Sequence, residues 1–234
     1  MSLFLGSRSL DADLTRAAVR AAEWLRNNHD KDGTYGKGQV NGLVFHALRV
    51  VGYNVEHGAE ILHAEINKEG GLDYVSGRAL AAYVLGVLAT CRDPSQFYGL
   101  DLVTSLQDKL DKYPQVGFNH PFQFSLAMIA LCTAGKDVGK WKYVNYIINN
   151  IQKQSITTAY ASGNTMSMHI LALKCVEEFI TRHNQIKFNL LVRIRGGIAT
   201  AGKELLRRQL LDGTFGQNLV TAADRKSTRL NSSH

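Results

Sequence analysis

Proline and long apolar runs are both scarce in this sequence, and each absence excludes a class of structure. Only three prolines occur among 234 residues, so long helices can run without interruption. No stretch approaches the roughly 20 consecutive apolar residues that a membrane-spanning helix needs. The opening residues 1–8 are few and lack a basic start, so they do not form a convincing signal peptide. Composition alone leaves two alternatives: a cytosolic protein, or a chain whose natural N-terminus lies upstream.

Sequence motifs of common catalytic sites are also absent. There is no HExxH zinc motif, no GxSxG nucleophile motif and no phosphate-binding glycine loop. The acidic clusters of terpene cyclases, the thioester sequence of complement-type toroids and the Asp/Cys/His zinc set of prenyltransferases are missing as well. Paired aspartates occur only in turns, which leaves general acid–base chemistry without carriers. We therefore predict that the protein is not an enzyme.

Two segments resemble metal sites only in part. Residues 28–33 match the start of a calcium-binding loop, but its twelfth position is Gln39, where a bidentate glutamate is required. His57, Glu60 and His63 would share one helix face, but no third strong ligand stands at a suitable spacing. We predict no metal site at either position.

The formal charge of +7 suggests nucleic-acid binding until its distribution is considered. Residues 224–234 have no apolar period and resemble the in-frame translation of a sequencing adapter, so we interpret them as an artefact tail. Residues 1–223 contain 24 Lys and Arg against 19 Asp and Glu, a net charge of +5. One local basic cluster occurs, at residues 193–208, and the other basic residues are scattered. We predict no nucleic-acid partner.

Apolar residues recur with helical period along most of the chain, and β-like alternation is nearly absent. The first predicted helix covers residues 11–28. Four more apolar helices follow Gly-containing turns, at residues 40–51, at 76–91, up to Cys132 and up to Cys175. More polar helices are predicted around residues 99–112, 138–153 and 186–209.

The apolar helices begin about 40–50 residues apart, which is the spacing of a repeat built from helical hairpins. Such hairpins form either an open solenoid or a closed α/α toroid, in which the apolar helices make the inner ring. Two matching loops, residues 32–36 (Asp-Gly-Thr-Tyr-Gly) and 212–216 (Asp-Gly-Thr-Phe-Gly), favour the toroid. In each loop glycine permits a left-handed turn, the aspartate accepts hydrogen bonds from nearby amides, and the aromatic ring anchors the loop to a helix.

The cysteine count is odd. Cys91, Cys132 and Cys175 each stand late in an apolar helical run. They can be three buried thiols in a reducing compartment, or a disulfide pair with one unpaired cysteine. Composition favours three thiols.

Four motifs between residues 79 and 223 resemble, in order, the helical domain of the transcobalamin, intrinsic factor and haptocorrin family. The first is Leu-Ala-Ala-Tyr at residues 80–83 running to Cys91, and the second is Pro-Phe-Gln at 121–123 leading to Cys132. The third runs from Asn164-Thr165 to Cys175, and the fourth is the loop at residues 212–217. An arthropod branch of the family is the closest fit. The resemblance implies an all-α, α/α-toroid domain over residues 1–223, incomplete at its C-terminal end because the family's small β-domain has no counterpart.

The same resemblance implies a secreted carrier of cobalamin. In the family, a disulfide joins the positions of Cys132 and Cys175, and the partner of Cys91 lies beyond this sequence. Disulfides imply an extracellular location. The implied partners are a corrinoid and a cell-surface receptor. The cobalamin-facing residues that the resemblance implies are Asn119, Gln123, Asn164, Thr165, Gln217 and Thr221.

Three positions depart from the family pattern. Ala161 stands where some members place a cobalt-ligating histidine, Asn164 replaces an aspartate, and Ala79 replaces a glutamine. We therefore expect a corrinoid held through amides without a histidine ligand. Two alternatives remain open: Asn164 and Thr165 could only cap a helix, and the protein could be a toroid scaffold that has lost its ligand. A lyase or prenyl-chain enzyme on the same fold is the third alternative.

Overall fold

The structure is a computed structural model, and it describes residues 4–36, 38–113, 118, 120–156, 163–183 and 187–208. All the regular elements in these ranges are helices, as the sequence predicts. They are α1 (Phe4–Asn27), α2 (Gln39–Val50), α3 (Gly58–Lys68), α4 (Gly77–Ala89), α5 (Leu102–Asp111), α6 (Pro121–Thr133), α7 (Trp141–Ile156), α8 (Gly163–Arg182) and α9 (Phe188–Arg208). Within the described ranges, no helix is both long and apolar enough to cross a membrane.

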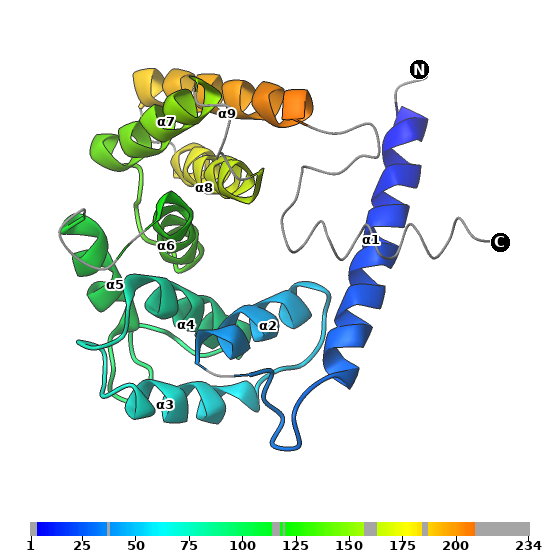
Figure 1. The fold of residues 1–234 in the computed structure, drawn as a ribbon, viewed down its shortest axis with the longest axis vertical. Coiled ribbons are helices and arrows are strands. Elements are labelled where there is room, and N and C mark those ends of the chain that lie inside the picture. Colours follow the sequence, from blue (N-terminus) through cyan, green and yellow to red (C-terminus); the bar gives the residue numbers. More distant parts are fainter. Residues whose placement is uncertain are drawn as a thin grey trace. The chain divides into compact units, whose positions relative to one another are not determined.

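The chain divides into two compact units, Met1–Phe118 with α1–α5 and Asn119–His234 with α6–α9. In the first unit α2 packs against α4, and α3 packs against both (Figure 1). In the second unit α8 packs against α6 and α9, and α7 also contacts α9. A closed toroid would require a particular placement of the two units, and it stays a prediction.

The predicted helix positions are confirmed with two corrections, the first being that α1 begins at Phe4 and not at residue 11. Helix α8 does not end near Cys175 but continues to Arg182. Val176 and Ile180 are fully buried and extend the apolar stripe of Leu173 by further turns, so the hydrophobic face carries the helix past the cysteine. The sequence scheme of hairpins also omitted α3, which fills the gap between α2 and α4.

Helices α2 and α4 are in close contact at a glycine on each helix, Gly42 and Gly86. A Cβ atom added to Gly42 would lie 2.3 Å from the carbonyl oxygen of Ala82, and one added to Gly86 would lie 2.5 Å from the Cα of Gly42. Neither residue has room for a side chain, because the obstructing atoms belong to the backbone. Interiors are packed as densely as organic crystals, so this crossing requires glycine on both helices.

Two connections show that α6 and α8 run parallel. The Cys132–Cys175 disulfide is formed, with a Cα–Cα distance of 6.3 Å, which confirms the pairing that the family resemblance implies. Nearer the start of each helix, the Oγ of Ser125 lies 2.7 Å from the Nδ1 of His169. Both links join residues at similar distances from the two helix starts, so the N-terminal ends of α6 and α8 lie at the same end of the unit.

His169 connects three helices inside the second unit. Its side chain is fully buried, its Nδ1 contacts Ser125 of α6, and its Nε2 lies 2.8 Å from the Oδ1 of Asn150 on α7. With Asn150 accepting from Nε2–H, Nδ1 is left to accept from the Ser125 hydroxyl, which specifies a neutral ring. Burial, and then the nearby His120, lower the pKa of His169 to about 4.

We predict that Gly42→Ala destabilises the protein by roughly 1–3 kcal/mol, because the added methyl group must displace the backbone of α4. Gly196→Ala in α9 is the matched control. No atom lies within 4 Å of its added Cβ, so alanine should be neutral or raise stability by up to about 1 kcal/mol. Thermal unfolding measures both, and equal effects would contradict the glycine crossing.

We also predict that stability falls as the pH drops from about 6.5 toward 4. In that window the unfolded chain binds a proton at His169 that the folded protein does not bind. The free energy of unfolding therefore falls by at most about 3 kcal/mol. His169→Gln should lower stability at neutral pH and flatten the pH dependence, and His183→Gln, at the exposed residue that follows α8, is the control substitution. Denaturant unfolding at several pH values tests this. An unchanged pH slope in the His169 variant would refute it.

Candidate functional site

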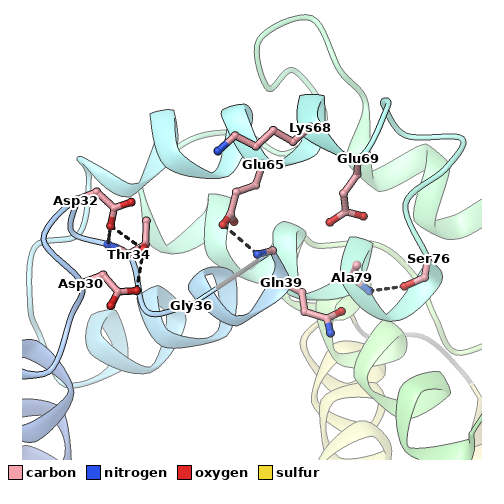
Figure 2. Close-up of a pocket in the computed structure, with 11 residues that line it drawn as sticks. Asp30, Asp32, Thr34, Gly36, Gln39, Glu65, Lys68, Glu69, Ser76 and Ala79 are labelled. Carbon is pink, nitrogen blue, oxygen red and sulfur yellow. Dashed lines mark hydrogen bonds between the residues drawn. The ribbon is translucent and has the colours of Figure 1, made fainter.

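The candidate site in the first unit is a cavity of about 830 Å³ at the N-terminal ends of α2 and α4. Gly38 and Gln39 contribute from the start of α2, and Ser76 and Ala79 from the start of α4. Figure 2 shows Glu65 of α3, and Glu69 just after this helix, extending toward these helix ends. The rest of the lining is Asp30, Asp32, Thr34, Gly36 and Lys68. The cavity is therefore rich in hydrogen-bonding groups and carries more acidic than basic side chains.

Asn41 holds this site together, although it does not line the cavity. Its fully buried amide accepts a hydrogen bond from the backbone N–H of Tyr35 at 2.6 Å. The same amide donates to the carbonyl oxygen of Gly36 at 3.1 Å and to the Oε1 of Glu65 at 2.7 Å. One side chain thus joins the loop before α2 to helix α3.

Glu65 caps α2 from outside the helix. Its Oε1 also accepts from the backbone N–H of Gly38 at 3.0 Å, where α2 has no capping side chain of its own. Its Oε2 is buried and has no hydrogen-bond partner among the described residues. Burial raises the pKa of this carboxyl, and the hydrogen bonds from Asn41 and Gly38 partly oppose that rise. The second oxygen is an acceptor available for a donor in the cavity.

Glu69 is oriented by the buried Tyr83 of α4. The Tyr83 hydroxyl donates to the Oε1 of Glu69 at 2.6 Å, and burial followed by this bond raises the pKa of Tyr83 above its usual value. The phenol therefore stays protonated and remains a donor. Tyr83 fixes the position of Glu69 at the wall of the cavity.

The loop at residues 32–36 behaves as its sequence predicts. Asp32 accepts from the backbone N–H and the hydroxyl of Thr34, and these bonds lower its pKa. Gly33 and Gly36 have positive φ values of 78° and 119°. The ring of Tyr35 packs edge-on against Phe45 of α2, with centroids 6.0 Å apart. The matching loop at 212–216 lies outside the described residues.

The carboxylates of this loop are occupied by local hydrogen bonds. Asp30 and Asp32 both accept from the Thr34 hydroxyl (Figure 2). Among the described residues, no group of three or more His, Cys, Asp or Glu side chains is arranged to hold a metal ion.

The ring of His63 on α3 stacks on Tyr98, with 4.3 Å between the ring centroids, and contacts Asn67.

Three of the six predicted ligand residues lie in the described ranges, at the N-terminal ends of α6 and α8. Gln123 is half-buried in the first turn of α6, Asn164 is exposed in the first turn of α8, and Thr165 is 2% exposed. Because α6 and α8 run parallel, these side chains belong to the same end of the second unit. Asn119, Gln217 and Thr221 lie outside the described residues, as does Ala161.

His120 is the capping residue of α6. Its Nδ1 accepts from the backbone N–H of Phe122 at 3.1 Å, so in the neutral ring the proton stays on Nε2. A neutral imidazole binds a metal through its unprotonated nitrogen. His120 is therefore committed to capping and is not available as a metal ligand in this arrangement.

Ser125, His169 and Asn150 have the order of a nucleophile, a base and an orienting group, but they do not form an open site. Ser125 and His169 are both fully buried, so no substrate reaches the hydroxyl in this structure. Sequence reasoning missed this network, and it also missed Gln39, Asn41, Glu65 and Glu69 around the cavity. One available signal was the polar Asn41 close to the apolar residues Val40, Leu43 and Val44 of α2.

Comparison with known proteins supports the resemblance that the motifs indicate. A sequence model of the eukaryotic cobalamin-binding proteins matches residues 21–223. No curated protein and no solved structure gives a match. Since the matched region covers most of the sequence, the chain belongs to the eukaryotic cobalamin-binding protein family.

Proposed function

We propose that this chain binds a corrinoid, cobalamin in the first instance, at the N-terminal ends of its apolar helices and carries it without chemical turnover. The observation that carries the proposal is the cavity at the ends of α2 and α4, which combines an amide, hydroxyls and carboxylates in one open recess. Family membership supplies the ligand class.

The polar groups fit the rim of a corrin ring, which carries primary amide side chains. Each such amide offers two N–H donors and one acceptor. The free Oε2 of Glu65 and the carboxylate of Glu69 would accept from ligand N–H groups, while Gln39 both donates and accepts. In the second unit Gln123 and Asn164 have the same dual capacity.

We further propose that cobalt receives no imidazole from the protein. Ala161 stands at the family's histidine position, and His120 is held by its capping bond. The ligand would then keep its own base and be bound through its periphery.

We also propose that the protein is secreted, that residues 1–223 form a closed α/α toroid, and that a cell-surface receptor is a partner. The Cys132–Cys175 disulfide supports an oxidising compartment, where such bonds persist. The family match ends at residue 223, which supports treating residues 224–234 separately.

A scaffold function without ligand is the second candidate, and Ala79 favours it. Its side chain lines the cavity at a position where some family members place an amide. Alanine at this position offers the cavity no hydrogen-bonding side chain, whereas an amide would. Binding measurements separate the two functions directly.

We predict that the full chain binds cyanocobalamin and that Gln39→Ala, Gln123→Ala and Asn164→Ala each weaken binding about five-fold. Each removes one amide contact of about 1 kcal/mol. Calorimetry or the shift of the corrin absorption band measures the affinity. Asn149→Ala on α7, also an exposed asparagine, should have no effect.

The proposed function would be wrong if the folded chain, checked by circular dichroism, showed no binding at high micromolar cyanocobalamin. Equal loss in the Asn149 variant would show that the effects are not specific to the helix ends.

A further inference from the structure

The second unit carries an unusual charge arrangement around the starts of α7 and α9. Lys140 immediately precedes α7 and Lys187 immediately precedes α9, and neither helix has an acidic residue in its first turn. The N-terminus of a helix is its positive end, and positive side chains there are unfavourable. Two adjoining helix starts thus each carry a basic side chain, and that of Lys187 pairs with Asp137.

A groove lies between these two helix starts. It has a volume of about 560 Å³ and is lined by Gly139, Trp141, Lys187, Phe188, Asn189 and Leu190. Trp141 is 51% exposed and Phe188 is 73% exposed, and Val192, one turn further along α9, is also exposed. Large apolar side chains gathered in one place on a surface indicate a contact site.

Basic groups surround the groove. The guanidinium of Arg193 lies 5.5 Å from the centroid of the Trp141 ring, and the ammonium of Lys142 lies 5.1 Å from the ring of Tyr143. Asp137 is the acidic neighbour: it accepts from the N–H of Gly139 and pairs with Lys187 at 3.0 Å. The wider unit has the same sign, since residues 119–223 contain 12 Lys and Arg against 5 Asp and Glu.

We propose that this groove binds an acidic polypeptide segment of another protein, with a bulky apolar side chain placed between Trp141 and Phe188. Charge complementarity argues for an acidic partner, because carboxylates would meet two helix N-termini and four basic side chains. The concave shape and exposed rings argue for an inserted side chain. A partner without apolar groups would leave those rings uncovered. Tryptophan and arginine are also the residues that most often dominate protein interfaces.

None of the residues that line this groove is among those proposed to bind the corrinoid, so its test needs no corrinoid. The probe is a short synthetic peptide in which glutamates flank a central Leu-Phe pair. The full chain carrying Trp24→Phe leaves Trp141 as the single tryptophan, because the sequence contains only two. Binding should shift and enhance Trp141 fluorescence, and the affinity should fall as salt is added.

In that background Phe188→Ala and Lys142→Glu should each weaken peptide binding about ten-fold. Lys142→Glu places an acid in the first turn of α7, which favours the helix, so its unfolding temperature should hold or rise while binding is lost. Leu206→Ala and Lys203→Glu are the matched controls. Both residues are exposed on α9 outside the groove, and both variants should bind normally.

Four outcomes would overturn the proposal. The first is no peptide binding, and the second is equal binding of a peptide of glutamates alone, which would indicate a general polyanion site. The third is binding to phosphatidylserine-containing vesicles, lost in Phe188→Ala, in place of the peptide, which would indicate a membrane surface. The fourth is a concentration-dependent dimer that Phe188→Ala dissociates, which would indicate a second copy of the chain.

Discussion

The first turn of every helix leaves backbone N–H groups without a partner inside the helix, and this constraint organises both units. The chain satisfies it in different ways at different helices. Ser76 and Asp101 cap α4 and α5 with their own side chains, His120 caps α6 with a ring nitrogen, and α2 depends on Glu65 from a neighbouring helix. The borrowed cap of α2 and the local cap of α4, Glu65 and Ser76, both line the cavity of the first unit.

In the first unit, Glu65 both caps α2 and lines the candidate ligand site, so one residue serves the fold and the cavity. Glu65 uses one oxygen for Gly38 and Asn41, and its other oxygen is buried without a partner in the part of the chain that the structure describes. Burying an acceptor without a hydrogen bond costs free energy unless a ligand supplies the donor. Asn41 and Tyr83 hold Glu65 and Glu69 in place, so the wall of the cavity is preorganised by buried groups rather than by its own surface residues.

In the second unit, the interactions that stabilise the fold involve different residues from those proposed to bind partners. The disulfide and the His169 network lie between α6, α7 and α8, and both are consistent with a rigid, parallel pair of helices whose starts present Gln123 and Asn164. The starts of α7 and α9 instead carry lysine, and Lys187 pairs there with Asp137. Capping chemistry therefore distinguishes the amide-bearing ends, suited to a neutral polar ligand, from the basic groove, suited to an acidic one.

The sequence by itself determined the helices, the turn at residues 32–36 and the family. These depend on local periodicity, on glycine in left-handed conformations and on motifs that are contiguous in the chain. The periodicity failed where burial extends a helix, as at Val176 and Ile180 in α8, because a cysteine does not end a helix when the apolar face continues. The hairpin scheme also missed α3. Tertiary structure alone decided the glycine crossing of α2 and α4, the Glu65 cap, the His169 bridge and the groove between Trp141 and Phe188. Each of these brings together residues far apart in the chain, and a single sequence carries no signal of which distant backbone or side chain will fill a given space.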